Sequence, residues 1–300
     1  MELISAPVKR LTVRTKWEEM RIIFLGDWQW AGKSSHGTAL NKLKETIAEG
    51  VERGAYFVGM GDYIDFLSPS NRQRLRSAAL YDTAEDVIDQ KSMELTHEIF
   101  DLALKPTVGR WLGLVEGHHF AQLKTGDTTD MRLCAMLKAP FLGTCGVIRL
   151  VFDRHGARVP VTLWVHHGHG NGQTGYYPLA RLERTAADQE GIDVFAIGHT
   201  TKLGHLVKNR MGYRWDHGGA AYHRTVHLIG TGGYSRAYIE GSKQGRVPRG
   251  GYAEQQMLGP AVIGSPTLII RPTRSKDSHF PVLKVEACGK RDHLSHRLAP

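Results

Sequence analysis

Cysteine is scarce in this chain of 300 residues, which contains Cys134, Cys145 and Cys288 and no CxxC pair. Thiols this few and this widely separated indicate neither a disulfide framework nor a cysteine zinc site, so we expect buried free thiols. No stretch approaches the roughly 18 consecutive apolar residues of a membrane helix. The N-terminal segment has no apolar run typical of a secretion signal. We therefore expect a cytoplasmic protein with no membrane partner.

Acidic residues are fewer than basic ones, 30 against 39, which gives a formal charge of +9. A basic surface favours phosphate-bearing or nucleic-acid partners over cationic ones. The chain also has 16 histidines, several of them in glycine-rich turns. Histidine is the commonest metal ligand, so this count indicates a metal site.

Five short apolar runs share one pattern, because each is followed by a turn that combines glycine with acidic or histidine residues. The runs are RIIFL (21–25) before GDWQ, YFVGM (56–60) before GDYID, WLGLV (111–115) before EGHH, VTLWV (161–165) before HHGH, and VFAI (194–197) before GHTT. Each run is apolar without clean alternation, which predicts a strand buried on both faces.

Helical periodicity fills the intervals between these runs. The predicted helices span Thr38 to Arg53, Asp82 to about Leu104, Asp127 to Leu137, and Leu179 to Gln189. Asp82 and Glu85 have the spacing of a capping box, which predicts a helix start at Asp82. Strands alternating with helices indicate a layered α/β architecture.

The chain beyond Lys202 is rich in glycine and in short β-like runs, namely Thr225–Ile229, Thr267–Arg271 and Val282–Val285. We expect these runs to complete a second sheet that covers the first. The length favours one domain over residues 1–300, with a metal-site core at about 20–205, a second-sheet region at about 206–290 and a polar tail at 289–300.

Ligands of open α/β sheets bind at the carboxyl ends of the strands. Those ends carry Asp27, Asp62, His118, His119, His167 and His199. Carboxylates and imidazoles that converge from separate strands suit divalent ions such as manganese, iron or zinc. We therefore expect these side chains to meet at a common sheet edge.

The ordered turns GDWQ, GDYID, GHHF, HHGHG and GHTT resemble the GDxH, GDxxD, GNH(E/D), histidine–glycine and GHxH turns of the calcineurin-like metallophosphoesterases. GDYIDFLSPSNR and GGYAEQ further resemble the phage-encoded branch of that family. The resemblance covers about residues 20–205. It implies an α/β fold in the form of a four-layer α/β/β/α sandwich with mixed sheets, and two divalent metal ions, manganese first, with magnesium, iron or zinc as alternatives.

Site roles follow from the same resemblance. The implied ligands are Asp27 for the first metal, Asp62 for both metals, and His118, His167 and His199 for the second metal. His119 would protonate the leaving oxygen or stabilise charge on the phosphoryl group, and Asp65 would orient His119. The implied reaction is in-line attack on phosphorus by a hydroxide held between the metals.

Two positions depart from the family pattern, since Gln29 and Thr201 replace histidines that serve the first metal. Their oxygens suit harder ions, so we predict a tight second site and a weak first one. His36 and His205 are alternative ligands for the first site, although surface positions are the more common outcome. His169 is the alternative to His167.

Aromatic and histidine side chains near the turns are candidates for a substrate rim, namely Trp28, Tyr63, Tyr222 and His223, with core packing as the default. Two functions compete at this point. One is a phosphodiesterase or nuclease, with phosphomonoesterase and cyclic-nucleotide phosphodiesterase activity inside the same class. The other is a non-hydrolytic, metal-binding scaffold that kept the fold.

Overall fold

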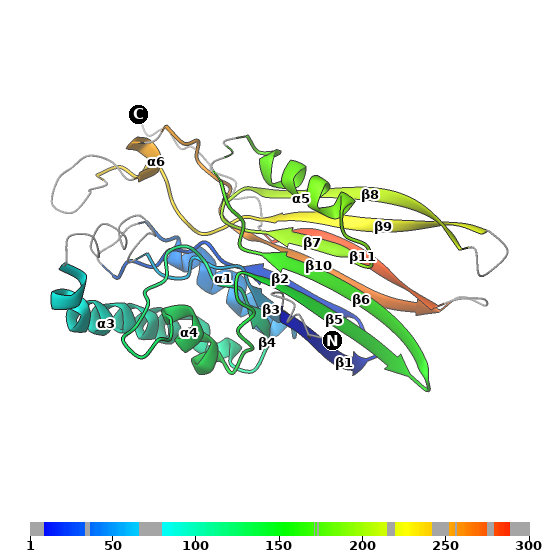
Figure 1. The fold of residues 1–300 in the computed structure, drawn as a ribbon, viewed down its shortest axis with the longest axis horizontal. Helices are drawn as coiled ribbons and strands as arrows, with labels where there is room; N and C mark the ends of the chain where they lie inside the picture. The colour runs from blue at the N-terminus through cyan, green and yellow to red at the C-terminus, as the bar shows by residue number, and fades with distance from the viewer. Residues whose placement is uncertain are drawn as a thin grey trace, which may run out of the picture.

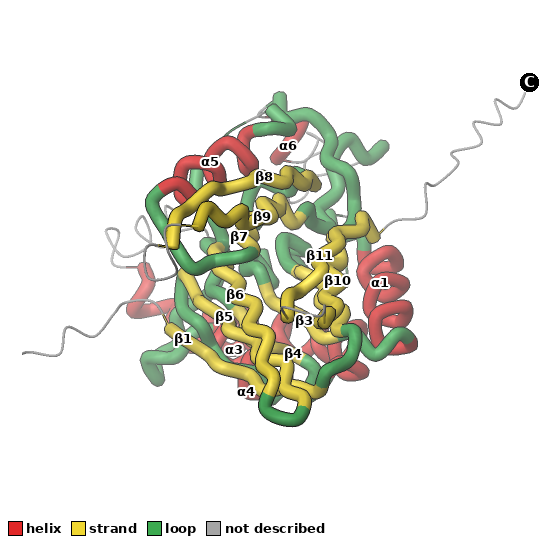
Figure 2. The backbone as a smooth tube through the Cα atoms, turned by 90° about the vertical axis from the view of Figure 1, so that its right-hand side faces the viewer, coloured by secondary structure: helices red, strands yellow, loops and turns green. Residues whose placement is uncertain are grey.

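The computed structural model describes residues 9–33, 37–65, 80–170, 172, 174–214, 220–241, 252–255, 257–274 and 279–288. Two mixed β-sheets pack face to face, and helices lie on the outer side of each (Figure 1, Figure 2). The layers therefore follow the predicted order α/β/β/α.

The five-stranded sheet has the order β11-β10-β2-β3-β4. Its strands are β11 (His279–Cys288), β10 (Ser265–Arg274), β2 (Met20–Leu25), β3 (Tyr56–Gly59) and β4 (Trp111–Leu114). Strands β2, β3 and β4 run parallel, whereas β10 pairs antiparallel with both β2 and β11. The carboxyl ends of β2, β3 and β4 therefore reach the same edge.

The six-stranded sheet has the order β1-β5-β6-β7-β9-β8. Its strands are β1 (Lys9–Lys16), β5 (Cys145–Arg154), β6 (Ala157–His166), β7 (Val194–Ile197), β9 (Ala220–Thr231) and β8 (Leu203–Arg214). Strands β6, β7 and β9 run parallel, and β8 returns antiparallel to β9. The carboxyl ends of β6 and β7 therefore also share one edge.

Apolar side chains from both sheets fill the space between them. Phe24 and Val58 of the five-stranded sheet belong to one buried cluster with Leu150, Leu163 and Ile229 of the six-stranded sheet. Strands between two layers need apolar residues on both faces, which is why β2, β3, β4 and β7 lack polar alternation.

Helices cover the two outer faces through separate clusters. The helices on the five-stranded sheet are α1 (Leu40–Glu52), α3 (Leu80–Ile99) with its π-helical and 3₁₀ continuations (Phe100–Leu104, Lys105–Thr107), and α4 (Thr129–Leu137). Leu43, Leu95 and Leu133 belong there to one buried cluster with Phe57. On the six-stranded sheet, α5 (Tyr177–Ala187) buries Leu182. A short helix, α6 (Tyr252–Gln255), lies near the C-terminal end, and no helix among the described residues is long and apolar enough to cross a membrane.

The predicted strands and helices are confirmed, but three details of the prediction are wrong. The C-terminal runs do not complete one sheet, because β9 joins the six-stranded sheet and β10 and β11 join the other. Asp82 does not start its helix, since α3 already includes Leu80. The helix predicted from Asp127 begins at Thr129, and Thr128 caps it by accepting a hydrogen bond from the Met131 N–H. Cys134 is a buried free thiol, as predicted, whereas Cys145 is free but only half-buried.

Candidate metal centre

The candidate ligands come from both sheets. The turns after β2, β3 and β4 carry Asp27, Asp62 and His118, whereas those after β6 and β7 carry His167 and His199. The expectation of a single sheet edge is therefore wrong, because periodicity predicts strands without predicting which strands pair. The two edges face each other, and the Nδ1–H of His167 donates to the carbonyl oxygen of Met60 across the interface at 2.6 Å.

The turns that carry these side chains have an unusual backbone. Asp27, Gln29, Asp62, His199 and Thr201 all have φ between 45° and 66°, in the left-handed region that non-glycine residues rarely adopt. Such conformations cost about 1–3 kcal/mol each and persist where the surrounding structure holds them, often at functional sites. All five stand at positions singled out from the sequence as metal-ligating.

Gly117 shows how closely two of these turns approach. A Cβ atom on Gly117 would overlap the backbone nitrogen of Asp62. Without a side chain, the turn after β4 can donate the His118 and His119 N–H groups to Oδ1 of Asp62, at 2.5 and 3.1 Å. Only glycine permits this approach.

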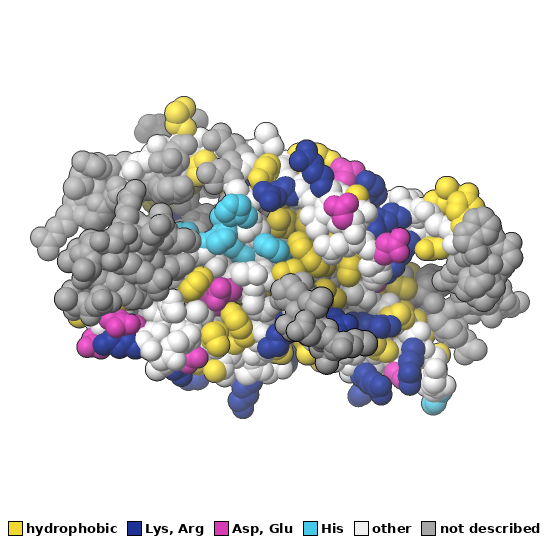
Figure 3. Space-filling model, in the orientation of Figure 1, with side chains coloured by type: hydrophobic (Ala, Val, Ile, Leu, Met, Phe, Trp, Pro, Cys, Tyr) yellow, Lys and Arg dark blue, Asp and Glu magenta, His cyan; other side chains and the backbone are white. Residues whose placement is uncertain are grey.

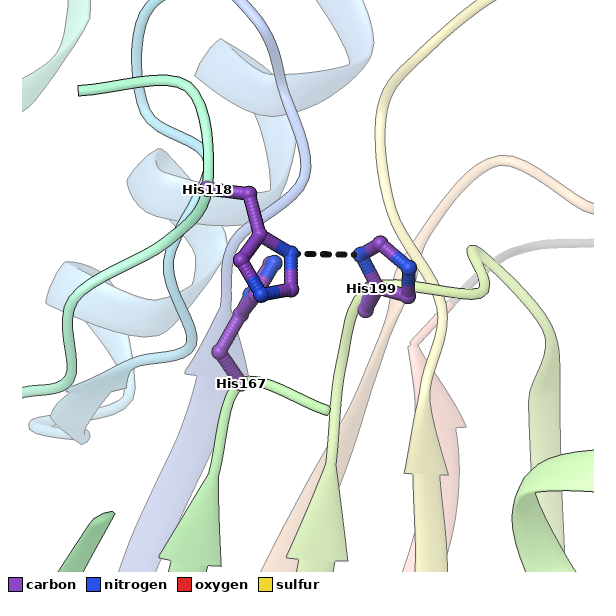
Figure 4. A group of neighbouring side chains, drawn as sticks. All are labelled: His118, His167 and His199. Atoms are coloured by element: carbon purple, nitrogen blue, oxygen red, sulfur yellow. Dashed lines mark hydrogen bonds between the residues drawn. The ribbon is translucent and has the colours of Figure 1, made fainter. Parts of the chain in front are cut away.

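Three imidazoles form what we call the three-histidine cluster, His118, His167 and His199. One ring nitrogen of each lies within 4.8 Å of the others, and the Nδ1 atoms of His118 and His199 are 3.2 Å apart (Figure 4). Burial lowers the pKa of His118 and of His199 to about 4, so both rings are neutral at pH 7. Neutral imidazoles are the form that binds metal ions.

A second group, the carboxylate cluster, consists of Asp27, Asp62 and His167, whose ligand atoms also lie within 4.8 Å of one another. All three side chains are buried. Oδ1 of Asp27 and Nε2 of His167 have no hydrogen-bond partner among the described residues. Buried polar atoms are almost always satisfied, so a carboxylate oxygen and a ring nitrogen that both lack a hydrogen bond inside a ligand cluster fit a divalent cation.

The charges of the carboxylate cluster are unevenly distributed. Burial raises the pKa of Asp27 to about 7. Burial also opposes ionisation of Asp62, but the neighbouring His167 charge and backbone N–H donors outweigh it and lower the Asp62 pKa. Burial disfavours a charged His167, yet Asp62, 3.3 Å from Nε2, raises the His167 pKa to about 9. Without metal, the proton on Nε2 of His167 therefore lies next to Asp62, where a cation would bind.

His119 and Asp65 lie together beside the carboxylate cluster. The ring Nδ1 of His119 is 3.0 Å from Oδ1 of Asp65, and its Nε2 is 3.9 Å from Oδ2 of Asp62. Burial lowers the pKa of His119, but the hydrogen bond to Asp65 and the charges of Asp62 and Asp65 raise it above its ordinary value. A carboxylate on Nδ1 leaves Nε2 pointing to the cluster as a proton donor.

Comparisons with known proteins add little to this geometry. No protein-family model matches the chain, and no curated protein matches it. Among solved structures, the chain is similar to Vacuolar Protein Sorting 29 from Cryptosporidium parvum, with 10% sequence identity and a TM-score of 0.29. That match covers 90% of this chain and 99% of the other.

The two substituted positions are both engaged with protein groups. The Gln29 amide nitrogen lies 3.5 Å from Oδ2 of Asp62, and Gln29 Oε1 accepts a hydrogen bond from the Ser235 hydroxyl at 3.2 Å. Thr201 donates its hydroxyl proton to the Thr200 carbonyl, which leaves its oxygen lone pairs open. Ser235 was not predicted, because nothing in its local sequence distinguishes it.

Asp130 is a further residue that the sequence motifs missed. It is buried on α4, and its Oδ2 accepts the Gly117 N–H at 3.0 Å, which holds the turn before His118. Burial raises the pKa of Asp130 to about 7. No sequence signal links α4 to this turn, since the contact depends on how α4 packs.

The alternative ligands have three different outcomes. His169 is exposed, with its ring 5.6 Å from that of His118, at the rim of the three-histidine cluster. His205 instead stacks on His227 within the six-stranded sheet, 3.0 Å between ring nitrogens. His36 lies outside the described residues.

The substrate-rim prediction is wrong. Trp28 and Tyr63 are buried at 0% and 1% exposure and pack on each other, and the Tyr63 hydroxyl donates to the Val115 carbonyl. Tyr222 and His223 lie toward the other end of β9. Because Gly230 pairs with the last residue of β7, Tyr222 is roughly 27 Å from the site at 3.4 Å per residue.

Proposed function

We propose that the chain is a metal-dependent phosphoesterase, and within that class a phosphodiesterase or nuclease. The observation that carries this proposal is the pair of overlapping ligand clusters beside the His119–Asp65 hydrogen bond. A site that only binds metal has no use for an oriented imidazole next to the cluster. An oriented imidazole next to divalent ions is what phosphoester cleavage requires.

The residues divide between two sites. His118, His167 and His199, with Asp62, would hold one ion through three imidazoles and one carboxylate, and His167 would lose a proton when it binds the ion. Asp27 and Asp62, with oxygens of Gln29 and Thr201, would hold the other. When bound, the ions supply polarisation of the phosphoryl oxygens and a lowered pKa for water.

The remaining steps fall to protein groups. Protonated His119, with its pKa raised by Asp65, can donate the Nε2 proton to the leaving oxygen. Asp65 accepts the hydrogen bond from Nδ1–H of His119, so the His119 ring presents Nε2 to the site. Two backbone N–H groups hold Oδ1 of Asp62, the carboxylate that both sites would share.

A non-hydrolytic, metal-binding scaffold is the second candidate, and Gln29 is the observation that favours it. Its amide is hydrogen-bonded to Asp62 and Ser235 where the first ion would need a ligand. A protein that binds only the second ion would still fold and still bind metal. It would lack the two-ion arrangement on which hydrolysis depends.

The two candidates separate in one experiment. The purified chain is incubated with manganese, magnesium or zinc and either bis-p-nitrophenyl phosphate or labelled single-stranded DNA. The phosphoesterase predicts turnover that Asp62→Ala and His119→Ala abolish. Absence of turnover with every metal, in a protein that still binds one ion per chain, supports the scaffold instead.

A further inference from the structure

Beside the three-histidine cluster lies a second group of polar side chains to which no role has yet been given. His169 follows His167 by two residues, and its exposed ring stacks on His199 with centroids 6.4 Å apart and an interplanar angle of 12°. In Figure 3, histidine side chains gather in the middle of this face, with Lys and Arg side chains next to them. The rim of the cluster is therefore open to a ligand.

Arg181 of α5 is fixed at this rim. Its Nη1 donates to the His169 carbonyl oxygen at 2.8 Å and to the Tyr177 hydroxyl at 2.9 Å, and its guanidinium lies 5.8 Å from the Tyr177 ring centroid. Two hydrogen bonds from one nitrogen hold the side chain without using Nε or Nη2. Those two nitrogens have no acceptor within the described part of the chain.

The charge of Arg181 also lacks a counter-ion among the described residues. Neighbouring cations differ in this respect, since Lys208 pairs with Glu183 at 2.8 Å and Arg224 pairs with Asp193 at 2.8 Å. An exposed guanidinium with two free donors in one plane suits bidentate binding of a phosphate. Arg181 is hydrogen-bonded to the backbone of His169, and the ring of His169 stacks on that of His199 in the three-histidine cluster.

We infer that Arg181 and His169 bind the phosphate next to the scissile one, so that the substrate is a nucleic-acid strand. The inference rests on the proposed function and deepens it. With the scissile phosphate at the ligand clusters, the chain of a polynucleotide would pass the His169 ring and place its next phosphate at Arg181. A monoester or a cyclic nucleotide has no second phosphate for this position.

Binding without turnover tests the inference separately from catalysis. Fluorescein-labelled oligothymidylate is titrated with the full chain in the presence of a chelator, and anisotropy is read at several salt concentrations. Arg181→Ala should weaken binding about tenfold and reduce the salt slope by about one. Arg184→Ala, which removes an exposed arginine farther along α5, is the matched control and should change binding less than about twofold.

Two more variants separate charge from structure. Tyr177→Phe removes one anchor of Arg181 but keeps the charge, so binding should stay within about twofold of wild type. His169→Ala should also weaken oligothymidylate binding in the presence of the chelator, because it removes the ring that lies between Arg181 and the three-histidine cluster. Equal binding by Arg181→Ala and Arg184→Ala overturns the inference, as does failure of the wild type to bind oligothymidylate at low salt.

The outcomes distinguish the two proposals. One outcome is that the protein hydrolyses bis-p-nitrophenyl phosphate and that Arg181→Ala does not weaken oligothymidylate binding. That outcome rejects the subsite and keeps the phosphoesterase. Arg181-dependent binding in a protein that hydrolyses no phosphoester keeps a phosphate-binding site at Arg181 but rejects the phosphoesterase, and with it the assignment of that site to the phosphate next to a scissile one.

Discussion

We predict that replacing Gln29 by histidine converts the first metal site, proposed to be weak, into a tight one. In the present chain, Gln29 offers the carboxylate cluster an amide whose nitrogen, 3.5 Å from Asp62, cannot ligate a cation. Its oxygen is held by Ser235. An imidazole at this position would add a nitrogen ligand to the carboxylates of Asp27 and Asp62.

The size of the effect follows from what is lost and gained. Histidine is among the residues that tolerate positive φ, so the φ of 45° at position 29 adds little strain. The lost Ser235 hydrogen bond costs about 1 kcal/mol. Changes to the groups around a bound metal typically alter affinity about 10–100-fold. We therefore expect the affinity of the first site for manganese or zinc to rise by about that factor.

Isothermal titration with manganese, checked by elemental analysis after dialysis, measures the change. Wild type should bind one ion tightly and a second weakly, whereas Gln29→His should retain two ions per chain. Gln29→Ala controls for loss of the amide alone and should retain one. Two equally tight ions in wild type, or one retained ion in Gln29→His, would refute the assignment of Gln29 to the first site.

Three further predictions concern protonation and packing. Asp65→Asn removes the partner that raises the His119 pKa, so the alkaline limb of the activity–pH profile, where protonated His119 is lost, should move to lower pH. Metal affinity should rise with pH between 6 and 8, because binding must displace protons from Asp27, with a pKa of about 7, and from His167, with a pKa of about 9. Calorimetry in buffers of different ionisation enthalpy should show proton release on binding. Metal binding without proton release would contradict this prediction. Phe24→Ala, between the sheets, should lower the free energy of unfolding in urea by about 3–5 kcal/mol.

The sequence predicted the turns that carry the candidate ligands because the signal is local. An apolar run before glycine and a polar residue marks the end of a buried strand, and the structure brings Asp27, Asp62, His118, His167 and His199 together. The same signal contains nothing about pairing, so the division of these strands between two sheets was missed. Strand β1 was also missed, since its residues are only half-buried and alternate with exposed arginine, threonine and lysine at the edge of the sheet.

Aromatic residues near the turns were the least predictable. Trp28 and Tyr63 follow metal-ligand positions, but the left-handed turns direct both into the cluster under α1 and α3. Placing Tyr222 required the register of β9 against β7, which only the assembled sheet supplies. Asp130 and Ser235 act on the site through hydrogen bonds to residues distant in the sequence, so neither has a local motif.

The central claim is that these turns hold divalent metal ions, and the anomalous signal from crystals grown with manganese tests it directly. We predict a strong peak within coordinating distance of His118, His167 and His199, and a weaker one beside Asp27. Manganese peaks confined to other parts of the protein, with neither cluster occupied at saturating concentration, would contradict the account.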